Sequence, residues 1–232
     1  MSNPALRQIL AFYRDLGITE LYLAPPPTMP EQLPNPLTVL SGDDTLDLIR
    51  QDMGECTRCR LHAGRNKIVF GSGNPASPLV FVGEGPGADE DAQGLPFVGR
   101  AGQLLTQMIE GTAKKEGIPV VRDQVYICNV VKCRPPENRT PEPDEMQTCG
   151  QFLFRQLMVI RPKAICALGS TAAKALLGTR DGVMKLRGSW HKWNDIPVIV
   201  TFHPSYLLRP YNQNAKREAW EDLKKVLHYV YD

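Results

Sequence analysis

Four short apolar segments recur along the chain, and each leads into a loop rich in glycine or polar residues. They cover residues 79–83, 124–131, 163–170 and 197–202. Continuous apolar runs of this length are typical of strands buried on both faces of a sheet. Segments with helical spacing of apolar residues separate them. This alternation predicts an α/β fold, a three-layer α/β/α sandwich with a central, mostly parallel four-stranded sheet.

The helices are predicted from the positions of apolar residues and from helix-start signals. Residues 67–71 read as a short edge strand, whereas the acidic stretch 89–91 and the following 94–97 read as loops. Helical segments are expected at 45–53, from Gly99 onward, from Thr140 onward, from the turn at Ser170 through Leu177, and at 215–230.

The first 44 residues differ in character from the rest of the chain. Residues 4–17 place their apolar side chains on one helical stripe, and residues 25–36 contain six prolines. We therefore expect an amphipathic helical extension over 1–24, a proline-rich linker over 25–44 and one domain over 45–232.

The composition excludes several classes of protein. A net charge of +2 does not support a broad polyanion-binding surface, so any nucleic-acid contact must be a local patch. We find no signal peptide and no run of membrane length, which predicts a cytoplasmic protein without a membrane partner. Six cysteines in 232 residues are too few for a disulfide scaffold.

The cysteine spacing indicates ligation of a metal or a cluster. Cys56 and Cys59 form a Cys-x-x-Cys pair, and no strand precedes them as in a thioredoxin-like redox motif. The cysteine spacing alone does not distinguish a zinc site from an iron–sulfur cluster. Cys128 and Cys166 lie inside apolar strands and are expected to be core residues.

Polar residues follow three of the predicted strands. Glu84 follows the first, Asn129 lies near the end of the second, and His203 follows the fourth. Because the carboxyl ends of parallel strands meet at one sheet edge, we expect these residues to form a ligand site. The pattern Gly-x-Gly-x-x-Gly is absent, which argues against a dinucleotide.

Several motifs in order give the chain a specific resemblance. These motifs are 56–59 (CTRC), 83–87 (GEGPG), 96–100 (PFVGR), 129–136 (NVVKCRPP) and 203–209 (HPSYLLR). With them, the chain resembles, from about Thr45 to the C-terminus, the bacterial and archaeal uracil-DNA glycosylases with an iron–sulfur cluster, usually called family 4. The departure is Gly85, where the family more often has alanine; both residues are small, so we expect little consequence.

The resemblance implies an enzyme that flips uracil out of DNA and hydrolyses its N-glycosidic bond. It also implies a structural [4Fe–4S] cluster held by four thiolates. The implied ligands are Cys56, Cys59, Cys133 and Cys149.

The implied uracil pocket has a distinct task for three residues. Phe97 offers a ring on which the base stacks, Asn129 reads the uracil edge and rejects cytosine, and His203 donates to O2 as the base departs. Glu84, Gly85 and Pro86 line the pocket. Glu84, Glu90 and Asn138 are candidates for positioning water or stabilising the sugar cation, and Glu90 is also the candidate for excluding the thymine methyl.

The implied DNA surface follows the last strand. Ser205 would contact a phosphate, Leu207 or Leu208 would fill the vacated stack, and Arg209 would contact the backbone. Further phosphate contacts are expected from Arg134, Arg139, Lys132 and Arg187. The expected partner is uracil-containing DNA, single- or double-stranded, bound by a monomer.

Two other readings compete with the glycosylase. One is a related protein that traps uracil-DNA covalently through a histidine in an inserted basic loop, but residues 136–141 contain no histidine and no insertion. The other is a non-catalytic zinc module that binds nucleic acid. Metal analysis and visible absorption distinguish that module from an iron–sulfur enzyme.

Overall fold

The computed structural model describes residues 44–209 and 212–232. The extension and linker predicted over 1–24 and 25–44 lie outside the described residues, except for Asp44.

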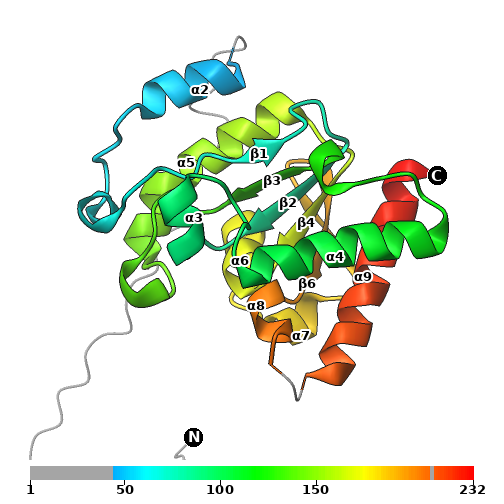
Figure 1. Cartoon of the computed structure of the whole chain (residues 1–232). Coiled ribbons are helices and arrows are strands. Elements are labelled where there is room, and N and C mark those ends of the chain that lie inside the picture. Colours follow the sequence, from blue (N-terminus) through cyan, green and yellow to red (C-terminus); the bar gives the residue numbers. More distant parts are fainter. Residues whose placement is uncertain (1–43, 210–211) are drawn as a thin grey trace, which may run out of the picture. The chain divides into compact units, whose positions relative to one another are not determined.

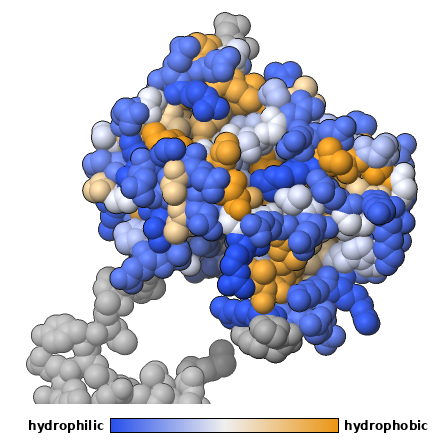
Figure 2. Space-filling model, in the orientation of Figure 1, coloured by the Kyte–Doolittle hydropathy of each residue, from blue (hydrophilic) through white to orange (hydrophobic). Residues whose placement is uncertain are grey.

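On the face drawn in Figure 2, hydrophobic residues form separate patches within a mainly hydrophilic surface.

A single sheet forms the centre of the described domain (Figure 1). Its strands run in the order β1-β3-β2-β4-β6-β5, and the four central ones are parallel. Their bounds are β1 Ser72–Gly73, β2 Leu79–Gly83, β3 Tyr126–Asn129, β4 Ala164–Leu168, β5 Trp190–Trp193 and β6 Ile196–Thr201. The prediction of a mostly parallel α/β sheet is confirmed.

The predicted number of four strands is wrong, because the described sheet has six. The two missed strands are antiparallel edges, β1 against β3 and β5 against β6. Strand β1 has only two residues. An edge strand is expected at 67–71, but β1 begins one residue beyond that range, at Ser72. Strand β5 (WHKW) is only partly buried and carries two polar residues between its tryptophans, so it lacks the continuous apolar run of a central strand. Asn194 and Asp195, with φ of 46° and 66°, form its turn to β6.

Helices cover both faces of the sheet (Figure 1). The long ones are α4 Arg100–Glu116, α5 Pro143–Ile160 and α9 Gln213–Tyr231. The shorter α-helices are α2 Leu46–Met53, α3 Ala88–Gln93, α6 Ser170–Leu177, α7 Val183–Leu186 and α8 Pro204–Leu207. The described residues also form three 3-10 turns: η2 Arg60–Gly64, η3 Arg122–Gln124 and η4 Pro136–Asn138.

Alternate side chains of β2 enter two different cores. Leu79 and Phe81 pack with α4 and α9, whereas Val80 and Val82 pack with α2, α5 and α6. All four are fully buried. This alternation gives the predicted three-layer sandwich its two apolar layers.

The acidic stretch predicted as a loop is instead helix α3. Six residues are too few to display helical periodicity, so the pattern of apolar positions did not reveal it. Glu90 begins this helix by accepting from the backbone N–H of Gly87 at 3.0 Å. Asp89, Glu90 and Asp91 lie in its first turn, where acidic side chains are favourable.

Candidate functional site

The carboxyl ends of the central strands bring the predicted pocket residues together. Gly83 at the end of β2 pairs with Asn129 at the end of β3. A Cβ built on Gly83 would lie 2.5 Å from Phe97 Cζ and would also overlap Asn129 Oδ1. The rings of Phe97 and His203 have centroids 5.7 Å apart and are tilted by 36°. Phe97, Asn129 and His203 therefore converge beside a glycine that leaves them room.

The Asn129 side chain has an unsatisfied acceptor. Asn129 is 1% exposed, and its Oδ1 is buried without a hydrogen-bond partner among the described residues. Buried polar atoms are almost always paired, because leaving one unpaired costs about 1–3 kcal/mol. An unpaired oxygen beside an aromatic ring indicates a place for a ligand that donates a hydrogen bond.

The loop that carries Phe97 is held from several sides. Glu90 Oε1 accepts from the backbone N–H groups of Val98 and Gly99, each at 2.9 Å. Phe97 itself has a φ of 53°, a conformation that non-glycine residues rarely adopt. The Glu90 carboxylate thus positions the stacking ring.

Two further supports of this loop were missed by the sequence reasoning. Arg122 donates to the carbonyl of Pro96 at 2.8 Å, and a Cβ at Gly102 would overlap the Phe97 main chain. The Gly-x-x-Gly spacing at the start of α4 was a signal for Gly102. Arg122 had no sequence signal, since it lies in a separate 3-10 turn.

The hydrogen bonds of His203 determine its tautomer. The backbone N–H of Ser205 donates to His203 Nδ1 at 3.2 Å, and Ser205 Oγ lies 2.8 Å from the same nitrogen. Burial lowers the pKa of His203 to about 4, with the Glu90 charge opposing that shift. The neutral ring therefore accepts at Nδ1 and carries its proton on Nε2.

The first strand-end loop packs closely against the loop after β3. The Glu84 carboxylate accepts from the Thr171 hydroxyl, and its carbonyl accepts from Val131 N at 3.1 Å. Pro86 is buried. A Cβ at Gly85 would lie 2.7 Å from Val131 Cγ2. An alanine at this position would therefore require Val131 to shift, because a β-branched side chain is stiff.

Asn138 lies apart from the pocket residues. It is exposed in η4, and its Oδ1 accepts from Arg134 Nε at 2.8 Å. No contact described for residues 44–209 and 212–232 joins it to Phe97, Asn129 or His203.

The segment after β6 presents part of the predicted DNA surface. Ser205, Leu208 and Arg209 are exposed. Leu207, in contrast, is 1% exposed and packs with Phe202 in a small core cluster. The suggestion that Leu207 fills the vacated stack is wrong for this conformation, because a wedge must reach the surface.

The basic residues predicted to contact DNA also differ in exposure. Lys132 is 1% exposed, so its predicted phosphate contact is wrong. Arg187 is mostly buried and pairs with Asp222 at 3.1 Å. Arg139 is partly exposed and forms a bidentate pair with Glu145 at 2.8 and 2.7 Å. Arg134 and Arg139 stay predicted DNA contacts.

The four predicted cysteine ligands line one cavity. Cys56 and Cys59 come from the segment before η2, Cys133 from the loop after β3, and Cys149 from α5. Burial raises the pKa of the Cys59 and Cys133 thiols and raises that of Cys149 to about 12. Such an environment disfavours bare thiolates, so these cysteines would act as thiolate ligands only beside a cationic group.

Protein donors reach the sulfur atoms and the chain around them. Arg65 Nη1 lies 3.5 Å from Cys133 Sγ and donates to the Cys56 carbonyl at 2.5 Å. Lys132 N donates to Cys149 Sγ at 3.2 Å. These N–H groups suit thiolate ligands, which accept hydrogen bonds. Cys128 and Cys166 are fully buried in β3 and β4, which confirms them as core residues.

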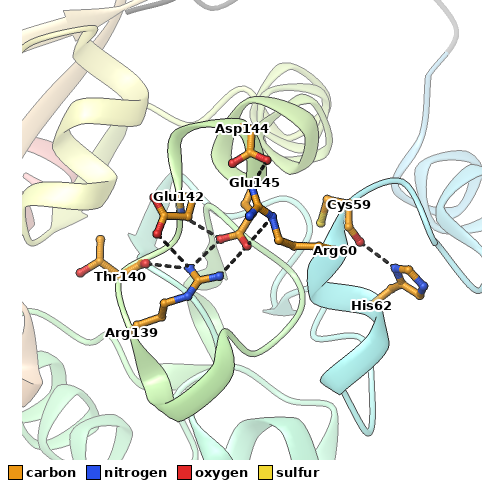
Figure 3. A network of polar contacts seen from close by, with 8 residues as sticks. All are labelled: Cys59, Arg60, His62, Arg139, Thr140, Glu142, Asp144 and Glu145. Carbon is orange, nitrogen blue, oxygen red and sulfur yellow. Dashed lines mark hydrogen bonds and ion pairs between the residues drawn. The ribbon is translucent and has the colours of Figure 1, made fainter. Parts of the chain in front are cut away.

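An ion-pair network joins the two segments that bring these cysteines together (Figure 3). Arg60 follows Cys59 and pairs with Asp144 and with Glu145, the latter at 3.5 Å. Glu145 has a fully buried side chain and also accepts from Arg139. The network therefore fixes η2 against the start of α5.

Two further observations concern membrane-spanning helices and sites for a single metal ion. No helix in the described part of the chain is long and apolar enough to span a membrane. Among residues 44–209 and 212–232, no group of three or more histidine, cysteine or acidic side chains is placed to hold a single metal ion.

Comparisons with known proteins agree with this arrangement. Residues 70–224 match the family model described as the uracil DNA glycosylase superfamily. The chain is 45% identical to a type-4 uracil-DNA glycosylase of Thermotoga maritima over 81% of this chain and 96% of that protein. It is 42% identical to one of Sulfurisphaera tokodaii (79% and 84% covered) and 40% identical to one of Archaeoglobus fulgidus (79% and 92%). The chain therefore belongs to the uracil-DNA glycosylase superfamily, among the type-4 enzymes.

Proposed function

We propose that this protein removes uracil from DNA by hydrolysing the N-glycosidic bond of a flipped nucleotide, leaving an abasic site for base excision repair. The observation that carries the proposal is the buried, unpaired Asn129 Oδ1 beside Phe97. A base inserted there stacks on the ring and donates to that oxygen.

Asn129 supplies the discrimination against cytosine. Uracil presents an N3–H donor and an O4 acceptor, which match an amide oxygen and an amide NH2. Cytosine presents an N3 acceptor and an N4 donor, so it leaves buried polar groups unpaired. The unpaired Oδ1 supports this role, because it needs a donor such as N3–H.

His203 stabilises the departing uracil as charge develops on O2. Its Nδ1 is occupied as an acceptor, so the Nε2 proton is available for donation. A pKa of about 4 makes it a neutral donor at physiological pH. A positioned donor of this kind contributes about 3–4 kcal/mol in comparable sites.

The acidic residues have separate proposed tasks. Glu90 positions the Phe97 loop through its three backbone bonds, and we retain it as the candidate that excludes the thymine methyl. Glu84, Gly85 and Pro86 line the pocket. Glu84 is the better candidate for positioning water or stabilising the sugar cation, since Asn138 is exposed and bonded to Arg134.

We further propose that the four cavity cysteines hold a structural [4Fe–4S] cluster. The shared cavity and the N–H groups directed at sulfur support this assignment. Four cysteines around one cavity match the four thiolates that hold a [4Fe–4S] cluster. The cluster supplies a rigid cross-link, whereas the pocket residues perform the excision.

The DNA partner contacts the segment after β6. Ser205 would contact phosphate, Leu208 would fill the vacated stack, and Arg209 would contact the backbone. Arg134 and Arg139, from the loop after β3, would add phosphate contacts. We also propose a cytoplasmic monomer whose catalytic domain spans 45–232.

The test is excision from labelled oligonucleotides that contain one uracil, followed by alkaline cleavage of abasic sites. We expect free uracil and strand breaks only at uracil. DNA that stays covalently attached to protein would instead indicate a trap, and absence of both products would refute the proposal.

A further inference from the structure

Lys132 is a buried lysine between the cysteine cavity and Asn129. It is 1% exposed and lines the cavity with the four cysteines. Its backbone N–H donates to Cys149 Sγ at 3.2 Å, while its Nζ donates to the Asn129 carbonyl at 2.9 Å. One residue therefore contacts both the proposed cluster ligands and the proposed base-reading residue.

The far side of the ammonium is fixed by a buried polar network. Nζ also donates to Gln156 Oε1 at 2.6 Å. Gln156 in turn donates to the Phe70 carbonyl at 3.0 Å and to the Tyr126 hydroxyl at 3.2 Å. Because Gln156 is fully buried, the lysine head has a single well-defined position at the end of β3.

Burial lowers the pKa of Lys132, and no carboxylate in the described residues is placed to hold its ammonium form. Both of its acceptors are neutral oxygens, and no carboxylate within the described residues forms an ion pair with it. A buried charge that lacks a partner is strongly destabilising. A cluster held by thiolates is anionic, and the cavity that Lys132 lines is where that negative charge would lie.

We propose that Lys132 is a positioning residue that couples the cluster to uracil recognition. Its ammonium balances the charge of the cluster, and its bond to the Asn129 carbonyl fixes the strand end from which the side chain reads the base. This inference rests on the proposed function. It assigns the cluster a second effect beyond cross-linking, namely holding the recognition residue in register.

The direct test is the reduction potential of the cluster in Lys132→Met. Removing a nearby positive charge makes reduction less favourable, so the potential shifts to a more negative value. Lys163→Met is the matched control, since Lys163 also donates to a main-chain carbonyl, that of Val230 at 3.2 Å, but does not line the cavity. We expect no shift in that control.

The second readout is single-turnover excision of uracil. Lys132→Met should lower the rate constant about ten- to a hundredfold, the usual effect of losing a supporting contact, with DNA affinity unchanged. Lys132→Gln keeps a donor but no charge, so it should shift the potential while retaining more of the rate. If Lys132→Met does not fold, Lys132→Gln decides the charge effect.

A cluster potential equal to that of the control in the neutral variants would overturn the proposal. Wild-type protein that binds no cluster or excises no uracil would instead refute the proposed function. The two failures are therefore distinguishable.

Discussion

The proposed uracil pocket and the cysteine cavity are organised differently, although Lys132 lines the cavity and also donates to the Asn129 carbonyl. In the pocket, Asn129 Oδ1 is buried and unpaired, and Gly83 leaves space beside it. Around the cavity, Arg65 and the Lys132 backbone N–H reach the cysteine sulfurs, and ion pairs fix the supporting segments. The pocket suits an occupant that enters and leaves, whereas the cavity suits one that stays.

The two regions differ in whether their polar groups already have hydrogen-bond partners within the protein. The pocket retains an unsatisfied group, at a cost of about 1–3 kcal/mol that the correct ligand recovers on binding. In the cavity, burial raises the pKa of the Cys149 thiol to about 12, so a thiolate ligand there would depend on the positive charge of the proposed occupant. Substitutions in the two regions should consequently affect different properties.

The largest effect is expected at the cavity. Cys133→Ala or Cys149→Ala should lose most of the bound iron and lower the melting temperature, because the proposed cluster would join segments that are distant in sequence. Iron content and visible absorption measure the loss. Cys166→Ala is the matched control, a buried cysteine in β4 outside the cavity, and it should retain full iron. Equal iron in all three variants would contradict the ligand assignment.

The next effect is expected at His203. His203→Ala should lower the single-turnover rate by about a hundredfold or more while DNA affinity stays nearly unchanged, because the bond to uracil O2 strengthens in the transition state. Melting temperature and iron content should stay near wild type. A variant that loses stability but keeps its rate per folded molecule would make His203 a packing residue.

A smaller, more selective effect is expected at Asn129. Asn129→Asp should weaken uracil excision and allow some cytosine excision, because a protonated carboxyl donates to N3 and accepts from the N4 amine. Excision from matched uracil and cytosine oligonucleotides measures both changes. Undiminished uracil activity would remove Asn129 from the pocket.

The smallest effect concerns pH. The folded-state pKa of His203, about 4, lies below its ordinary value of 6.5. The unfolded chain therefore binds more protons between these values, so the contribution to stability is complete above about pH 6.5 and is lost as the pH falls toward 4. The free energy of unfolding, measured by denaturation, should fall more steeply between about pH 6.5 and 4 in wild type than in His203→Gln. Parallel curves would contradict the burial of the ring.

Sequence patterns predicted the parts of this molecule that depend on local composition. The four buried strands and the long helices follow from continuous apolar runs and helical spacing. Strand β5 could not be predicted in this way, because an edge strand carries no continuous apolar run. The exposure of Leu208 and burial of Leu207 likewise depend on how α8 packs, which no local pattern determines.

The candidate site was predicted in part for the same reason. The convergence of Glu84, Asn129 and His203 follows from parallel strands ending at one edge. The burial of Lys132 did not follow, since lysine is almost never fully buried without a partner. The support of the Phe97 loop by Glu90 and Arg122 required tertiary contacts as well.

The role proposed for Asn129 Oδ1, to accept the N3–H of uracil, is best measured by single-turnover excision from two oligonucleotides that differ only in carrying uracil or 3-methyluracil. Both are compared in wild type and Asn129→Gly. Wild type should prefer uracil by at least about a hundredfold. Asn129→Gly should narrow this ratio of rate constants, mainly by slowing uracil excision. An unchanged ratio in the glycine variant would show that another group reads the N3 position and that Asn129 does not.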